Sequence, residues 1–123
     1  MIEYLKVLRA DHWLKNIFIL FGHLVAIALL PDEVPQNKLE LATRIVLSLV
    51  PACLIASANY IINEILDAPF ARMHPTKRLR PVPAGTVKFP ILWMIMAVLT
   101  VVAFALAASW FNTGYIIALA LLL

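Results

Sequence analysis

Three long apolar stretches, separated by short polar ones, dominate this chain. They cover residues 13–30, 42–67 and 89–111, and each is about as long as the roughly 17–25 residues that an α-helix needs to cross a bilayer core. A fourth apolar stretch follows a short turn and covers 115–123, which is too short to cross. The pattern predicts an all-α fold, a polytopic bundle of transmembrane helices with three complete spans and the start of a fourth. We expect one domain over 1–123, the N-terminal part of a longer protein.

The composition and the charge agree with a membrane protein. Hydrophobic residues make up 63% of the chain and charged residues 14%, and the mean hydropathy is +0.93, which excludes an ordinary soluble domain. The formal net charge is +3, but the basic residues gather in one loop beside the membrane. We therefore expect a membrane, with anionic headgroups or phosphates, as the partner, and no nucleic acid. Cys53 stands alone in the sequence, so it offers neither a disulfide nor a thiolate metal cage.

The distribution of basic residues predicts the orientation in the membrane. The loop over 68–88 holds five Lys and Arg residues, whereas the stretch between the first two spans holds Lys38 and Arg44 against three acidic residues. Short loops rich in Lys and Arg stay on the cytoplasmic side. We therefore expect the N-terminus and the loop over 68–88 to be cytoplasmic in a multi-pass protein of a prokaryotic cell membrane. The basic start could also mark a cleaved signal peptide, but the later spans make the protein integral in either case.

Polar residues recur at helical spacing near the end of the second span. They form two adjoining rows, Asn59, Asn63 and Asp67 in one and Tyr60 and Glu64 in the other. Such a stripe is costly against lipid, so it should face the bundle interior or a wet cavity. For Asn59 we favour a hydrogen bond between helices.

The two acids of this stripe suggest a metal site. Glu64 and Asp67 are three residues apart, so their carboxylates can jointly hold a divalent cation. Pro69 should end the helix near Ala68 and leave the negative end of the helix dipole beside the acids. Magnesium takes one or two carboxylates and completes its shell with water and phosphate oxygens. We therefore predict that Asn63, Glu64 and Asp67 bind Mg2+; the alternative is that the acids are simply solvated at the membrane interface.

A basic segment follows the acids within the same loop. Three prolines stiffen it, at positions 75, 81 and 83, which restricts the reach of its side chains. Its basic and imidazole side chains are Arg72, His74, Lys77, Arg78 and Arg80. Such groups could neutralise a departing diphosphate. The alternative is a topology signal that needs no ligand, but the neighbouring acids favour ligand binding.

These residues together resemble the first signature of the UbiA superfamily of intramembrane transferases. The matching positions are Ser57, Tyr60, Asn63, Glu64 and Asp67, then His74, Pro75, Lys77, Arg78, Arg80, Pro81, Ala84 and Gly85. The family usually shows Asn-Asp-x-x-Asp-x-x-x-Asp followed by a basic loop. A shorter stretch, Leu8-Arg9-x-x-x-Trp13-x-Lys15-Asn16, is similar to the opening of the branch that includes polyprenyl-phosphate phosphoribosyltransferases.

The resemblance implies a larger helical bundle in which a magnesium-bound diphosphate is held between two acidic motifs, of which this chain contains the first. The chain also departs from the family pattern. Glu64 stands for the usual Asp and keeps the charge, whereas Ala71 replaces the last acid and loses it. Ala10 stands where the family commonly has proline.

The expected site has a catalytic part and a substrate-binding part. The catalytic part comprises Asn63, Glu64, Asp67, Lys77, Arg78 and Arg80, the first three with Mg2+. The substrate-binding part comprises Lys15, Asn16, Tyr60, Arg72 and His74. The resemblance implies a donor that is an isoprenoid diphosphate or a phosphoribosyl diphosphate, and an acceptor embedded in the lipid.

A noncatalytic or truncated membrane protein is the alternative, in which the acids and the basic loop bind anionic lipid or a partner. The replacement of the last acid of the family pattern by Ala71 favours this alternative. A second helix that ends in acidic residues further along the reading frame would favour an enzyme. A stop codon would favour the truncated protein. We expect the complete protein to be a transferase and the 123-residue chain alone to be inactive, because half of the metal cage is missing.

Overall fold

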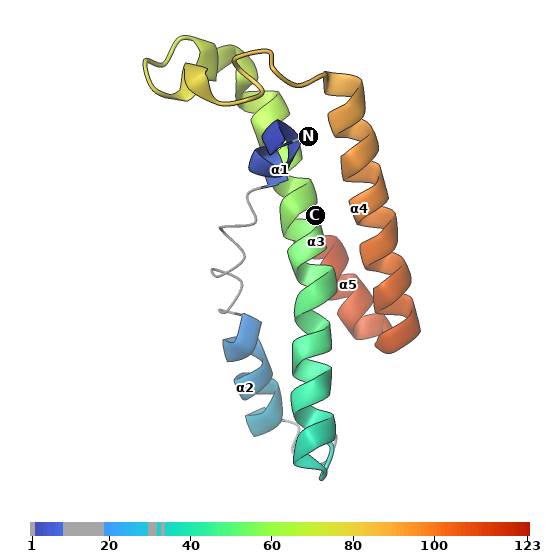
Figure 1. Ribbon diagram of the computed structural model, residues 1–123. Coiled ribbons are helices and arrows are strands. Elements are labelled where there is room, and N and C mark those ends of the chain that lie inside the picture. Colours follow the sequence, from blue (N-terminus) through green and yellow to red (C-terminus); the bar gives the residue numbers. More distant parts are fainter. Residues whose placement is uncertain (1, 9–18, 30–31, 33) are drawn as a thin grey trace.

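The computed structural model describes residues 2–8, 19–29, 32 and 34–123. All regular structure in these residues is helical, which confirms the predicted all-α class for the described part of the chain. The elements in order are α1 (Ile2–Leu8), α2 (Ile19–Leu29), α3 (Lys38–Arg72), the 3-10 turn η3 (Lys77–Leu79), α4 (Phe89–Trp110) and α5 (Thr113–Leu122). Figure 1 shows α3 as the central axis, with α4 running back along it.

Two of these helices are long and apolar enough to cross a membrane. They are α3, with 35 residues, and α4, with 22 residues, and they lie on the second and third predicted stretches. The shorter apolar helix α5 lies on the fourth stretch. Of the first predicted span, α2 covers Ile19–Leu29, and the rest lies mainly outside the described residues.

Helix α3 continues past the point where the sequence predicts its end. Asn37 caps its start, with the side-chain oxygen accepting from the Leu39 amide at 2.9 Å. The helix runs through Pro51 and Pro69 and ends at Arg72, so the expected end near Ala68 is wrong. A proline removes only its own amide donor, and the neighbouring turns can keep a membrane helix intact. At about 1.5 Å per residue α3 is about 52 Å long, more than the roughly 30 Å of a bilayer core.

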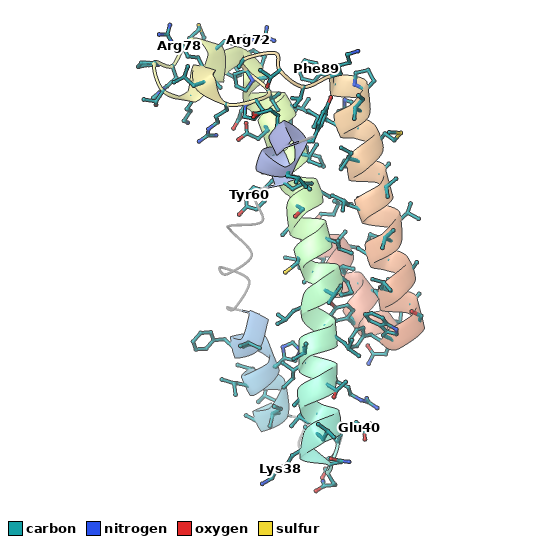
Figure 2. The ribbon with its side chains drawn as sticks, in the orientation of Figure 1. Lys38, Glu40, Tyr60, Arg72, Arg78 and Phe89 are labelled. Carbon is teal, nitrogen blue, oxygen red and sulfur yellow. The ribbon has the colours of Figure 1, made fainter. Side chains whose placement is uncertain are left out.

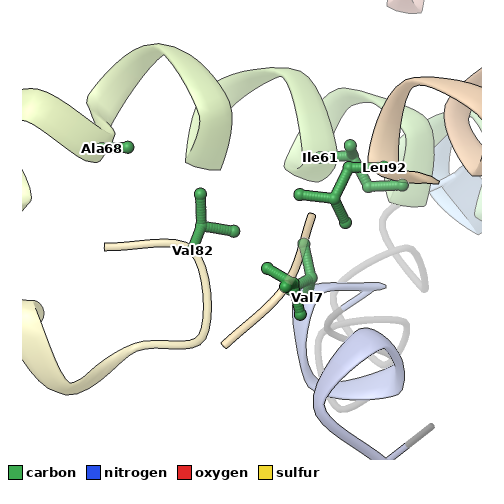
Figure 3. Packing of buried hydrophobic residues seen from close by; sticks show 6 residues of the cluster. Val7, Ile61, Ala68, Val82 and Leu92 are labelled. Carbon is green, nitrogen blue, oxygen red and sulfur yellow. The ribbon is translucent and has the colours of Figure 1, made fainter. Parts of the chain in front are cut away.

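Two apolar clusters join the helices. The first comprises Val7, Ile61, Ala68, Val82, Val87 and Leu92. It brings α1, α3, α4 and the segment between α3 and α4 together, and Figure 3 shows Val82 of that segment beside Ala68 of α3. The second comprises Ala52, Ile55, Ala103, Ala107 and Leu119, and joins α3, α4 and α5. Small residues at four of these eleven positions let the helix backbones approach closely.

Polar contacts also join the helices inside the apolar bundle. The buried Ser48 hydroxyl donates to the Ile45 carbonyl oxygen at 2.7 Å and lies 2.9 Å from His23 Nε2, which joins α2 to α3. Because that hydroxyl proton is already used, the His23 Nε2–H donates to Ser48 Oγ. Asn59 donates to the Leu122 carbonyl oxygen, so it links α3 to α5 as expected for a hydrogen bond between helices.

Replacing Ile61 by Ala should lower the free energy of unfolding of the complete protein by about 2–5 kcal/mol, because it leaves a cavity in the first cluster. The Ile61 side chain is fully buried. Leu66→Ala on the same helix is the matched control, since the Leu66 side chain is 62% exposed. Equilibrium unfolding in one detergent compares the variants, and equal losses for both would contradict the packing described.

Candidate functional site

The C-terminal half of α3 has one packed face and one open flank. Ser57, Ile61, Ala68 and Ala71 are buried and stand four, seven and three residues apart, which places them on one face of the helix. Glu64 falls on this packed face, and its side chain is only 11% exposed. Asn63 and Asp67 are exposed beside it. The two acids predicted to act together therefore lie in different surroundings.

An ion pair satisfies the buried acid. Arg80 Nη1 donates to Glu64 Oε1 at 2.9 Å, and the Arg80 side chain remains 39% exposed. A carboxylate that is largely removed from water needs a hydrogen-bonded partner of opposite charge. The packing of the loop on α3 explains why Arg80 is that partner: Val82, two residues later, is buried against α3 and holds this part of the loop in place.

The segment over 73–88, called the α3–α4 loop below, has its own hydrogen-bonded structure. The Arg80 amide donates to the Lys77 carbonyl oxygen at 3.0 Å, and the Ala84 amide donates to the Arg80 carbonyl oxygen at 2.9 Å. The turn that follows needs Gly85, whose φ of 73° lies in the left-handed region that side chains disfavour. The Lys88 amide donates to the Tyr4 hydroxyl at 3.2 Å, which ties the end of the loop to α1. Arg80 is therefore carried by an ordered segment.

His74 organises the start of this loop. Its Nδ1 accepts from the Thr76 amide at 3.3 Å, from the Lys77 amide at 3.4 Å and from the Thr76 hydroxyl at 3.1 Å. An imidazole that accepts at Nδ1 and is neutral carries its proton on Nε2. His74 thus orders the η3 turn with one nitrogen and keeps a donor on the other. Sequence reasoning gave His74 a ligand-binding role and missed this local one.

The remaining predicted side chains that the structure describes come from α3 and from the α3–α4 loop. Figure 2 shows Arg72 and Arg78 at the same end of the molecule as the start of α4, with Lys38 and Glu40 at the opposite end. Arg72, Lys77 and Arg78 are exposed. Tyr60 is half-buried on α3, about one helical turn before Glu64. Lys15 and Asn16 lie outside the described residues.

The donor set of α3 suits magnesium. No group of three or more His, Cys, Asp or Glu side chains comes together in the described part of the chain. Asn63, Glu64 and Asp67 offer two carboxylates and an amide oxygen within one helical turn, and Mg2+ usually takes only one or two carboxylates from a protein. Ala71, where the family pattern has an acid, is buried on the packed face and only 5% exposed. A carboxylate at that position would project from a buried position on the packed face.

The contacts that dock the loop were not predicted from the sequence. Val82 and Val87 are apolar residues within a polar, proline-rich segment, and both are buried in the first cluster. Val82 stands between Pro81 and Pro83, and a valine in such a segment is the signal that could have indicated a docked loop. The arrangement pairs Arg80 with Glu64. It leaves Asp67 and the other basic side chains of the loop exposed. Exposed cations and an exposed carboxylate are groups whose chemistry suits an anionic ligand and a divalent metal.

Comparison with known proteins gives one family and several curated relatives. The model of the UbiA prenyltransferase family matches residues 17–123. A decaprenyl-phosphate phosphoribosyltransferase of Mycolicibacterium smegmatis is 32% identical over 110 residues, which are 89% of this chain and 33% of the relative. The protein of the same name from Mycobacterium tuberculosis is 33% identical over 108 residues, 88% of this chain and 34% of the relative.

A third relative with this name, from Corynebacterium glutamicum, is 37% identical over 81 residues, which are 66% of this chain and 23% of the relative. The chain thus spans about a third or less of the length of these relatives. No solved structure gives a significant match.

Two substitutions distinguish the roles of the two ring nitrogens of His74. His74→Asn places an acceptor near the position of Nδ1 and should keep the amides of 76 and 77 protected in hydrogen exchange. His74→Gln places its amide near Nε2 instead, and we expect faster exchange there. Hydrogen–deuterium exchange with mass spectrometry on the complete protein makes the comparison. Equal protection in both variants would show that Nδ1 does not order the turn.

Proposed function

This chain belongs to the UbiA prenyltransferase family, and from that premise we propose that the complete protein transfers a phosphoribosyl group from a diphosphate donor to a polyprenyl phosphate. The observation that carries the proposal is the docking of a basic loop beside Glu64 and Asp67, two carboxylates of α3. Arg80 Nη1 lies 2.9 Å from Glu64 Oε1. The names of the curated relatives favour phosphoribosyl transfer over other reactions of the family.

In this proposal the chain binds the phosphates of a polar donor at the surface of an apolar bundle. Arg72, Lys77 and Arg78 are exposed and bind phosphate oxygens of the donor. His74 donates from Nε2 to the same phosphates while Nδ1 orders the loop. These donors stabilise the negative charge that grows on the leaving group, because the loop backbone that carries most of them is already hydrogen-bonded before the reaction.

The reaction breaks one bond and forms another. The bond between the donor carbon and the diphosphate oxygen breaks, and the diphosphate leaves with the electron pair. An oxygen of the acceptor phosphate forms the new bond to that carbon. Positive charge develops on the carbon, and in this proposal the half-buried Tyr60 offers the face of its ring to that charge. The apolar walls of the bundle restrict water that would compete with the acceptor.

Asn63, Glu64 and Asp67 would hold Mg2+ in the complete protein. The ion would neutralise the diphosphate as it departs. Their oxygen ligands fit that ion, as described above. Lys15 and Asn16 remain candidate substrate-binding residues.

Prenyl transfer from an isoprenoid diphosphate is the second candidate, because it needs the same leaving group and gives its name to the family. A noncatalytic role in binding anionic lipid is the third, and the exposed cations of the α3–α4 loop favour it. In all three cases the protein is an integral membrane protein. We propose that the α3–α4 loop faces the cytoplasm, since it is rich in Lys and Arg.

Donor competition separates these candidates. The complete protein in lipid nanodiscs, given phosphoribosyl diphosphate and a polyprenyl phosphate, should form a lipid-linked phosphoribosyl product. Mass spectrometry of the extracted lipid detects it. Transfer from an isoprenoid diphosphate alone would reject the preferred donor, and no transfer from either donor would favour the noncatalytic role.

Asp67→Asn tests the exposed acid. The substitution keeps the shape of the side chain and removes its charge, so we expect the rate to fall by two orders of magnitude or more, as is typical when an electrostatic contact to the transition state is lost. The melting temperature should change little, because Asp67 is exposed. Leu66→Asn is the control for a polar substitution at a neighbouring exposed position. A rate equal to that of the unsubstituted protein would remove Asp67 from the site.

A further inference from the structure

Arg80 differs from the other basic side chains near the candidate site. It is half-buried and bonded to Glu64, whereas Arg72, Lys77 and Arg78 are exposed and form no ion pair within the described residues. It also projects from a backbone that is hydrogen-bonded at its amide and at its carbonyl group. The sequence grouped all of these cations as phosphate ligands. The structure gives Arg80 a separate position, against the acid of the packed face.

This position affects the charge that an incoming metal ion meets. Of the two carboxylates, that of Glu64 is already neutralised by the Arg80 guanidinium, and Asp67 is exposed beside it. A divalent cation arriving alone would therefore find one uncompensated carboxylate and a nearby positive group that repels it. A cation that arrives with a diphosphate meets less positive charge at the site, because the phosphate oxygens offer Arg80 a new acceptor.

We propose that Arg80 makes metal binding at Glu64 and Asp67 depend on the diphosphate. The proposal rests on the proposed function, since it takes the metal and the diphosphate as ligands of this site. Without diphosphate, Arg80 holds Glu64 and weakens the site for free Mg2+. With diphosphate, the guanidinium shares its donors with phosphate oxygens, and the Glu64 carboxylate becomes available to the metal. Arg80 is thus a positioning residue that acts on the metal through Glu64.

The geometry permits this exchange without movement of the loop. The guanidinium carries five N–H donors, and one nitrogen, Nη1, makes the bond to Glu64 Oε1. The side chain is 39% exposed, so a ligand can reach it. The backbone on both sides stays fixed by Val82 and by the hydrogen bonds of the loop. A rotation of the guanidinium suffices to pass a donor from the carboxylate to a phosphate.

Calorimetry on the complete protein in nanodiscs tests the proposal, with MgCl2 alone and with MgCl2 at saturating inorganic pyrophosphate. The unsubstituted protein should bind Mg2+ much more tightly when pyrophosphate is present. Arg80→Gln should bind Mg2+ alone on the order of tenfold more tightly, and the enhancement by pyrophosphate should shrink by a similar factor. Arg78→Gln is the matched control: it should weaken pyrophosphate binding and leave the affinity for Mg2+ alone unchanged.

The outcomes separate this proposal from the proposed function. If the unsubstituted protein binds Mg2+ and pyrophosphate together but Arg80→Gln shows an unchanged or weaker affinity for Mg2+ alone, the role of Arg80 is overturned and the site stands. If the unsubstituted protein binds neither, the proposed function fails as well. Arg80→Lys keeps the charge and should keep the weak affinity for Mg2+ alone. Arg80→Lys provides the comparison if Arg80→Gln does not fold. If this charge-conserving change raised the affinity for Mg2+ alone tenfold, it would also contradict the proposal.

Discussion

The packing of Val82 against the C-terminal half of α3 is the contact on which the candidate site depends. Val82 is 1% exposed and belongs to a cluster that also contains Ile61 and Ala68 of α3 and Leu92 of α4. The burial of this valine, together with that of Val87, fixes the path of a polar loop on the helix. Arg80 can reach Glu64 because Val82 is held two residues further along.

The same packing divides the functional groups into two sets. Glu64 lies on the packed face of α3 and has a partner, while Asp67 and Asn63 lie on the open flank. Arg80 belongs with the first set, and Arg72, Lys77 and Arg78 are exposed. The ion pair between Glu64 and Arg80 and the exposed acid therefore lie within about one turn of α3. The burial of Ala71 explains why an acid at that position would have no access to this flank.

The sequence predicted the two long helices α3 and α4 because hydrophobic runs of bilayer length are a strong signal. It also predicted the family and the polar positions of α3, since helical spacing places them together. It placed the end of α3 too early because proline was taken as a stop, although the helix tolerates Pro69. It could not show that Glu64 is buried and Asp67 exposed, because that difference comes from the docked loop. The pairing of Arg80 and the local role of His74 depend on the loop backbone, which no periodic pattern encodes.

Docking of the α3–α4 loop on α3 is the central claim, and a cysteine cross-link tests it most directly. Ala68→Cys and Val82→Cys are combined in an otherwise cysteine-free complete protein, with Cys53→Ser, and the membranes are treated with a mild oxidant. Figure 3 shows these two side chains near each other where the loop meets α3, so we expect rapid formation of an intramolecular disulfide. Ala68→Cys with Leu79→Cys is the control, because Leu79 is 77% exposed. Equal or slower cross-linking of the first pair would contradict the docked loop and the site that it forms.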